Sequence, residues 1–170
     1  DGYNYMKWAV KVTNPNENYL LNNISITYQG KNKDGKVVNS GNLNMPSALG
    51  PKQEWLAQIY QISGVTDKEL STYGNLTYTF KVDTDKLEYI NKDEAGDFTF
   101  EVSNADFKAT SNEWGTQING SADVTNKTKF DGLTGRMNVI AYKDGTPVYM
   151  IDDSVPMINT GETALVSFEN

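Results

Sequence analysis

Apolar and polar residues alternate along most of the chain, in short runs that step by two positions. The first run contains Trp8, Val10 and Val12, and the same alternation returns over residues 24–28, 55–59, 76–82 and 98–102. Clusters of Asn, Gly, Asp and Pro separate the runs. A period of two between turn residues is typical of half-buried antiparallel strands. The pattern therefore predicts an all-β protein.

One stretch, residues 63–74, offers a start for a helix. Thr66 would be the N-cap, and Glu69 three residues later would complete a capping box. We expect one or two helical turns there.

Four segments occur twice, in the same order and at nearly one spacing. The pairs are KVTNPN (11–16) with DVTNKT (123–128), ISITY (24–28) with MNVIA (137–141), KDGKVV (33–38) with KDGTPV (143–148), and MPSALGPKQEWLA (45–57) with VPMINTGETALVS (155–167). Their first residues are 112, 113, 110 and 110 positions apart. The sequence therefore indicates an internal duplication with a few loop insertions.

The repeated segments also carry turn chemistry. Asn14-Pro15-Asn16 interrupts the alternation, because Asn accepts local hydrogen bonds while Pro fixes φ and has no N–H. Each Lys-Asp-Gly predicts a hairpin, in which Gly35 and Gly145 take a positive φ. We interpret both as turns of a β-sandwich built twice.

An acidic stretch separates the two copies. Residues 83–97 contain six carboxylates: Asp83, Asp85, Glu88, Asp93, Glu94 and Asp97. We expect two tandem immunoglobulin-like antiparallel β-sandwich modules, residues 1–86 and 97–170, joined by an acidic linker at 87–96. The second module has an opening strand at 98–114 without a clear counterpart before Tyr5. The first module either begins truncated or borrows residues 76–82 to complete its sheet.

Composition narrows the function. The net charge of −7 and the absence of a Lys/Arg cluster argue against nucleic acid as a partner and against direct binding to an anionic membrane. The chain has no Cys and no His, which excludes Cys nucleophiles, His-dependent triads and zinc sites built on thiolates or imidazoles. It has no run of 18 apolar residues, and its first residues lack the apolar region of a signal peptide. Any export signal would precede residue 1.

The segment from Phe100 to Glu169 resembles the FxLYD-type immunoglobulin-like domains of Gram-positive bacterial surface lipoproteins. The shared features are a strand that ends in Val-Thr-Asn, an alternating strand, an Asp-Gly hairpin and Gly-Glu-Thr before the last strand. The naming motif keeps only Tyr142, and the first half, with KVTNPN and KDGKVV, is a more distant match. The resemblance implies an exported, often lipid-anchored module without a known catalytic site. It assigns no functional residues.

The acidic stretch is the candidate metal site. Asp83, Asp85, Asp93, Glu94 and Asp97 could converge on Ca²⁺, which takes six to eight oxygen ligands. However, the stretch contains no Asp-x-Asp-x-Asp-Gly loop with a Glu at its twelfth position. A solvated linker explains the same residues, and both readings stay open.

Other carboxylates give little sign of catalysis. Glycoside hydrolysis needs two carboxylates on one site, but Asp152 and Asp153 are adjacent and would point to opposite faces of a strand. Glu54 and Glu162 are expected at equivalent positions of different modules. We therefore expect no enzymatic activity and no cofactor other than the Ca²⁺ considered above.

Aromatic residues are the second candidate surface. We expect Trp8, Trp55 and Trp114 to pack in the cores. A Tyr-rich face could bind glycan or peptide, since Tyr gives large contact area at low entropy cost; its candidates are Tyr3, Tyr5, Tyr19, Tyr28, Tyr60 and Tyr73. Asn-x-Ser/Thr sequons occur at Asn23, Asn75, Asn119 and Asn126.

Together these features favour a non-enzymatic extracellular module of a bacterial cell-surface (lipo)protein, which acts as a spacer or binds a protein or glycan. Its only link to the membrane would be an N-terminal lipid anchor outside this sequence. The alternative is an accessory domain of a larger secreted enzyme. A third reading is an assembly partner whose open edge strand accepts a strand of another chain.

Overall fold

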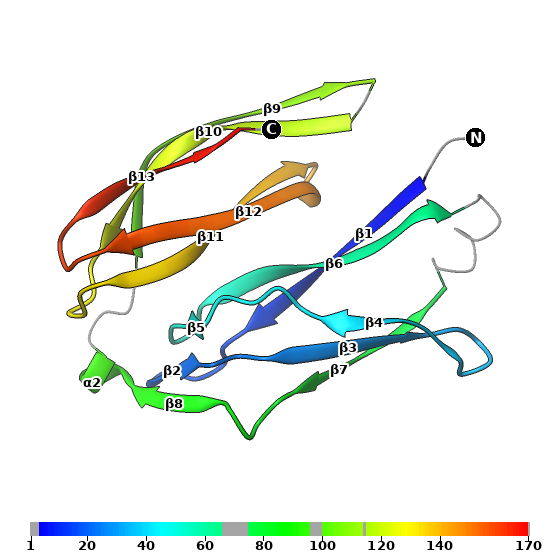
Figure 1. Cartoon of the computed structure of the whole chain (residues 1–170), viewed down its shortest axis with the longest axis horizontal. Coiled ribbons are helices and arrows are strands. Elements are labelled where there is room, and N and C mark those ends of the chain that lie inside the picture. The colour runs from blue at the N-terminus through cyan, green and yellow to red at the C-terminus, as the bar shows by residue number, and fades with distance from the viewer. Residues whose placement is uncertain (1–3, 66–74, 96–99, 114, 170) are drawn as a thin grey trace. The chain divides into compact units, whose positions relative to one another are not determined.

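The computed structural model describes residues 4–65, 75–95, 100–113 and 115–169 (Figure 1). Its strands are β1 (Asn4–Thr13), β2 (Tyr19–Asn22), β3 (Ile26–Lys31), β4 (Val37–Asn42), β5 (Ala48–Leu49), β6 (Glu54–Val65), β7 (Thr77–Val82), β8 (Glu88–Asn91), β9 (Phe100–Asn112), β10 (Gly115–Asn126), β11 (Leu133–Lys143), β12 (Thr146–Ile158) and β13 (Thr163–Phe168). One short helix, α2 (Lys92–Ala95), follows β8. The predicted all-β class is confirmed, and the several antiparallel sheets fit a β-sandwich.

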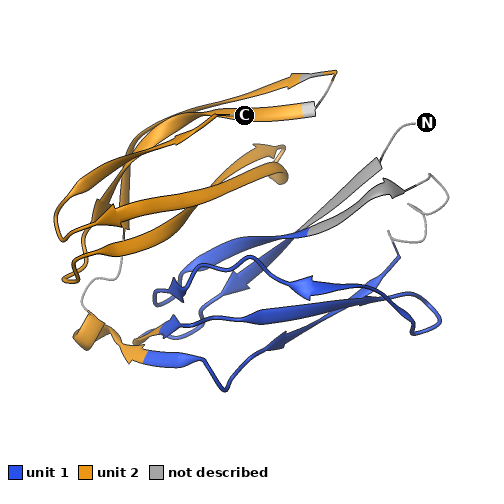
Figure 2. Ribbon diagram, viewed as in Figure 1, with its two compact units in different colours: residues 1–17, 21–89 blue, residues 18–20, 90–170 orange. Residues whose placement is uncertain are grey.

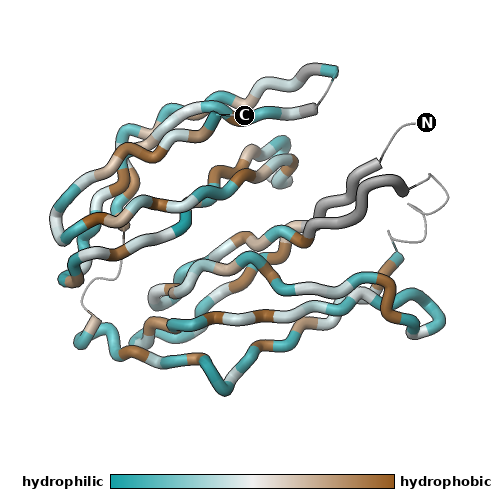
Figure 3. Tube along the Cα trace, in the orientation of Figure 1, coloured by the Kyte–Doolittle hydropathy of each residue, from teal (hydrophilic) through white to brown (hydrophobic). Residues whose placement is uncertain are grey.

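The chain divides into two compact units (Figure 2). Unit 1 consists of residues 1–17 and 21–89, and unit 2 of residues 18–20 and 90–170. Apolar and polar positions alternate along the strands of both (Figure 3). A further three-stranded sheet has the order β5-β2-β8.

Unit 2 has two layers around one core. One layer is the sheet β13-β10-β9, and the other is the hairpin β11-β12. β12 faces β13 and β10, while β11 faces β10. The core contains Ala122, Val124, Met137, Val155, Ile158, Val166 and Phe168, with Phe100 and Phe107 of β9 packed against it. This burial of apolar side chains holds the two layers together.

Unit 1 is also built from two layers. β1 pairs with β6, and β3 pairs with both β4 and β7. The core contains Ile26, Tyr28, Leu43, Leu49, Trp55, Ala57 and Ile59, with Val10, Val12 and Tyr78 among the side chains packed against it. Two glycines make room for tyrosine rings. A Cβ on Gly30 would lie 2.9 Å from the Tyr78 ring, and one on Gly41 would lie 2.9 Å from the Tyr28 hydroxyl.

The register of the strands supports the duplication seen in the sequence. β1 pairs with β6 in the same register in which β10 pairs with β13. Residues 8–13 of β1 correspond to residues 120–125 of β10, 112 positions later, and their partners on β6 and β13 are 109 positions apart. These pairs run from Trp8↔Ile59 to Thr13↔Glu54 in unit 1, and from Gly120↔Phe168 to Thr125↔Thr163 in unit 2. This register makes Thr163, not Glu162, the equivalent of Glu54, so the expected equivalence of the two glutamates was wrong by one residue.

The predicted hairpins are present but differ in length. Asp144 and Gly145 form a two-residue turn with φ of 51° and 76°, as a type I′ hairpin requires. In unit 1 the paired residues Lys31 and Val37 leave a five-residue loop, residues 32–36, in which Gly35 has φ 78°. Residues 63–65 belong to β6, and the helical turns expected from the Thr66 N-cap onward lie outside the described residues.

The two units place their third strand in different layers. In unit 2, β9 extends the β13-β10 layer, whereas in unit 1, β7 extends the β4-β3 layer (Figure 1). Residues 77–82 therefore do complete a sheet of unit 1, but not the sheet that β9 completes in unit 2.

Candidate functional site

A buried asparagine closes the sandwich of unit 1. Asn14, at the end of β1, is fully buried. Its Nδ2 donates to the carbonyls of Leu49 at 3.1 Å and Gly50 at 2.9 Å. Its Oδ1 accepts from the backbone N–H of Asn16 at 3.0 Å and from the Asn16 Nδ2 at 2.9 Å. We call this set the Asn14 knot; it joins the turn after β1 to the loop before β6.

Unit 2 contains the same arrangement, the Asn126 knot. Asn126 is also fully buried. Its Nδ2 donates to the carbonyls of Phe130 at 2.8 Å and Ile158 at 3.0 Å, and its Oδ1 accepts from the N–H of Thr128 at 2.9 Å and the Thr128 hydroxyl at 2.7 Å. Ile158 corresponds to Leu49 at the same spacing of 109 residues.

Backbone bonds around the two knots match as well. Asn14 N–H donates to the Gln53 carbonyl at 3.0 Å, and Asn126 N–H donates to the Glu162 carbonyl at 3.1 Å. Gln53 and Glu162 also accept, through their side chains, the N–H of the residue three positions earlier, at 2.8 Å and 3.1 Å. Glu162 is thus a loop-closing acceptor. Asn126 uses both amide hydrogens inside the core, so its sequon has a structural role.

The acidic candidates form local turns. Asp83 accepts from the N–H of Asp85 at 3.2 Å, between β7 and β8. Asp93 and Glu94 lie in α2, and Asp97 lies outside the described residues. Within the described ranges, no three Asp, Glu, His or Cys side chains come together as a metal site. The calcium hypothesis gains no support from this geometry and stays a prediction.

The other carboxylates are engaged in pairs that stabilise strands. Asp152 forms an ion pair with Arg136 across the β11-β12 hairpin, and Asp153 accepts from the N–H of Ser154 at 2.6 Å. Glu54 lies 3.0 Å from the Lys11 ammonium on the outward face of β1-β6. Exposed pairs such as Lys11–Glu54 contribute at most about 1 kcal/mol.

Aromatic residues divide between core and surface. Trp55 is buried, as expected, and its Nε1 donates to the Asn44 carbonyl at 3.0 Å. Tyr28 is buried, so it leaves the proposed exposed tyrosine face, and desolvation raises its pKa. Tyr19 is exposed. The remaining tryptophan and tyrosine candidates fall outside the described side chains: Trp8, Trp114, Tyr3, Tyr5, Tyr60 and Tyr73.

Two further exposed tyrosines were not among the candidates. Tyr89 and Tyr142 each present more than half of their surface to solvent. They belong to different units, and no pattern of alternation singled them out.

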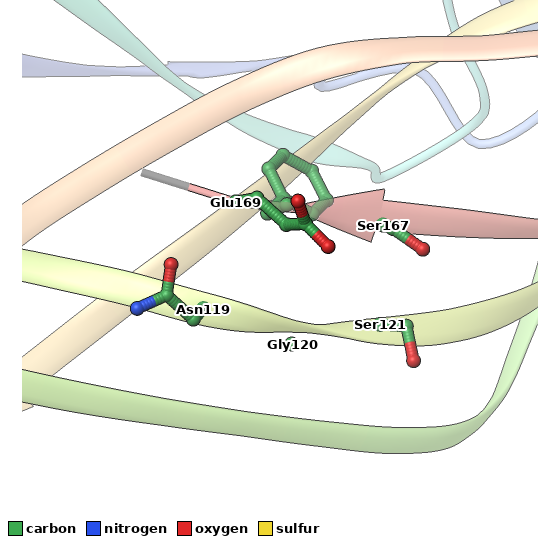
Figure 4. A pocket seen from close by; sticks show the side chains of 6 residues that line it. Asn119, Gly120, Ser121, Ser167 and Glu169 are labelled. Atoms are coloured by element: carbon green, nitrogen blue, oxygen red, sulfur yellow. The ribbon is translucent and has the colours of Figure 1, made fainter.

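A shallow concavity lies in unit 2 between the middle of β10 and the end of β13 (Figure 4). Its lining residues are Asn119, Gly120, Ser121, Ser167, Phe168 and Glu169. Gly120 has φ 152°, and a Cβ there would lie 2.0 Å from the Asp106 carbonyl. The glycine therefore lets β9 approach β10 closely.

Each unit exposes apolar side chains on the core-facing side of its third strand, which is β7 in unit 1 and β9 in unit 2. Phe80 and Val82 of β7 pair directly with the buried Tyr28 and Ile26, which places them on the core side of the sheet. They are nevertheless 45% and 42% exposed. In unit 2, Val102 of β9 pairs with the buried Val124 and is 52% exposed.

The opposite layer explains both exposures. In unit 2, β11 lies across from β10 and meets β9 at Phe100, where a Cβ on Gly135 would lie 2.9 Å from the Phe100 ring. Among the described strands none pairs with β11 on the side away from β12, so none covers Val102. In unit 1, β7 is the outer strand of the β4-β3-β7 layer, and the opposite layer consists of β1 and β6. By the same register, β7 lies beyond β1, which pairs only with β6 among the described strands. Sequence reasoning missed this site, since the residues read as ordinary strand residues.

Comparison with known proteins adds no relative. No protein-family model, no curated protein and no solved structure matches the chain. In the part of the chain that the structure describes, no helix has the length and apolarity needed to cross a membrane. The resemblance to FxLYD-type domains stays a prediction carried by the quoted segments.

Proposed function

We propose that the chain is a non-enzymatic extracellular module of a bacterial cell-surface (lipo)protein, made of two immunoglobulin-like sandwich units. It acts as a spacer or as a binding unit for a protein or glycan. The observation that carries the proposal is the asparagine knot built twice, in matching registers, around two separate cores. Sandwich domains of this architecture are common in cell-surface proteins.

Further features support the same role. The buried asparagines close loops and the Arg136–Asp152 pair joins two strands, as expected of a structural scaffold. The net charge of −7 favours solubility and repulsion between molecules. Exposed apolar side chains on β7 and β9 offer surfaces for a partner.

Surface location is the decisive test. The full-length protein should be cleaved when intact cells of the native organism are treated with an external protease, while a cytoplasmic marker stays intact. Metabolic labelling with a palmitate analogue should report the expected lipid anchor. Protection of the protein until the cells are lysed would overturn the proposal, and a catalytic domain in the full-length gene would favour the accessory-domain alternative.

A further inference from the structure

We infer that the open edge of β1 and the exposed core face of β7 together form a slot for one extended β-strand supplied by a partner protein. This inference rests on the proposed function, because it specifies how a binding module would hold its partner. The slot comprises the β1 edge with Phe80 and Val82 of β7.

Unit 2 shows what fits such a position. β10, the equivalent of β1, carries β9 on the edge away from β13, in antiparallel register. From there β9 packs Phe100 and Phe107 against the core. The equivalent edge of unit 1 pairs with no described strand, so its N–H and C=O groups are open to a ladder of the same kind.

The exposed core-face residues of β7 supply the second half of the slot. In a two-layer sandwich, a strand added beside β1 lies across from β7, because β3 and β11 are equivalent and β11 faces β10. Such a strand would cover Phe80 and Val82. The reverse holds in unit 2, where β9 is present, no described strand extends the β11-β12 layer beyond β11, and Val102 is exposed.

The register also defines the chemistry of the occupant. The occupant runs antiparallel to β1, as β9 does to β10. It has apolar residues at alternate positions that face the core, as β9 has. Asn104 of β9 donates to the Asp123 carboxylate at 2.7 Å, and the equivalent of Asp123 in unit 1 is Lys11. The Lys11 ammonium lies 3.0 Å from Glu54, and a carboxylate on the occupant would form a second ion pair with it, where β9 carries an amide donor. The partner segment is thus an alternating strand that is apolar in its inward row and carries a carboxylate near Lys11.

A synthetic peptide tests the slot directly. It has the sequence of residues 98–110 with Asn104→Asp, and it is titrated into the whole isotope-labelled chain while backbone amide shifts are followed by NMR. Saturable shifts are expected at residues 9–13 and 78–82. A peptide that also carries Val102→Asp puts a charge in the inward row and should bind at least about tenfold more weakly.

Matched variants of the chain locate the binding. Phe80→Ser, with Val82→Ser as a second variant, should weaken the peptide at least about tenfold, because the apolar surface that it covers is lost. Lys81→Ser, on the opposite face of the same strand, should change the affinity less than about twofold. Each variant is used only if its amide spectrum keeps the dispersion of the parent.

Three outcomes would overturn the inference. Shifts centred on β9 and β10 would mean that the peptide exchanges with β9. Concentration-dependent dimerisation, with protected β1 amides, would make a second copy the occupant. No shift at millimolar peptide would show that the edge is closed. None of these bears on surface location, so the slot and the proposed function fail separately.

Discussion

Unit 1 and unit 2 share the asparagine knot, the paired strands and their registers, yet they place the third strand in opposite layers. The knot recurs because its polar groups are buried, and each buried donor or acceptor needs a partner. A strand at the edge of a sheet needs only one neighbour and can join either layer. The comparison separates the buried polar contacts, which both units need, from the edge strands β7 and β9, which differ between the units.

Removing the knots should cause the largest loss. Asn14→Ala or Asn126→Ala removes four hydrogen bonds, two that the side-chain amide donates to carbonyls and two that its oxygen accepts, which should lower the free energy of unfolding by about 2–4 kcal/mol. Denaturant titration measures the loss, and hydrogen exchange assigns it to the unit that carries the substitution.

Two controls sharpen that result. Asn14→Asp keeps the acceptor for Asn16 but puts a carboxylate against the carbonyls of Leu49 and Gly50, and should be at least as destabilising as Asn14→Ala. Asn42→Ala, exposed on β4, should change stability by less than about 0.5 kcal/mol. Equal losses for all three would refute a structural role for the knot.

Gly120 tests the contact of β10 with β9, a strand that has no counterpart beside β1 among the described strands. Gly120→Ala sets a Cβ 2.0 Å from the Asp106 carbonyl and imposes an unfavourable φ, so about 2–3 kcal/mol of stability should be lost. Faster exchange of the β9 amides should accompany the loss. Gly145→Ala, at a turn where a Cβ meets nothing within 4 Å, isolates the cost of positive φ without the clash.

The sequence predicted the class and the duplication because both depend on local pattern. Alternation with a period of two marked the strands, and Asn-Gly-Asp-Pro clusters marked the turns. The repeat of Val-Thr-Asn located both knots, although not the burial of Asn14 and Asn126 or their bonds to loops more than 30 residues away. Those bonds depend on which loop the fold brings near.

The layer that each extra strand joins could not be read from the sequence. β7 and β9 have the same alternation, and a strand of either kind pairs with any open edge. The one-residue difference between the Glu54 and Glu162 alignments had the same origin, since a loop insertion shifts register without changing pattern. The exposure of Phe80 and Val82 depends on tertiary structure, because no described strand beside β1 covers them.

A smaller effect is expected at a turn where the units use different residues. Gly161 has φ 77°, and its equivalent in unit 1 is Lys52 with φ 60°. Gly161→Ala should cost about 1 kcal/mol, because a Cβ disfavours this conformation. Lys52→Gly should stay within about 0.5 kcal/mol of the parent. Relief of the same strain is offset by loss of the Lys52 bond to the Pro15 carbonyl at 2.8 Å and of its exposed ion pair with Glu17.

Melting temperatures of the two variants decide this point. The Gly161→Ala chain should melt lower by a few degrees, and Lys52→Gly should melt with the parent. A fall of the same size in both would mean that the two turns are not equivalent.

The smallest effects concern pH, and the units should respond at opposite ends of the scale. In unit 2, the Asp131 carboxylate accepts from the Thr160 N–H at 2.8 Å, and this bond lowers the pKa of Asp131. Its contribution is complete above the unfolded pKa, near pH 4, and is lost as the pH falls through the lower folded pKa. In unit 1, burial raises the pKa of Tyr28 and Tyr78. Their contribution is complete below the unfolded pKa, near pH 10, and is lost as the pH rises through the folded pKa.

Hydrogen exchange of each unit across the pH range tests this asymmetry. Asp131→Asn keeps an oxygen for the Thr160 N–H and removes the charge, so it should flatten the acid side in unit 2 alone. Tyr28→Phe should flatten the alkaline side in unit 1 alone. If Tyr28→Phe changed the alkaline profile of unit 2, the two cores would be coupled. Independent profiles would show that the duplicated knots close two sandwiches that fold on separate terms.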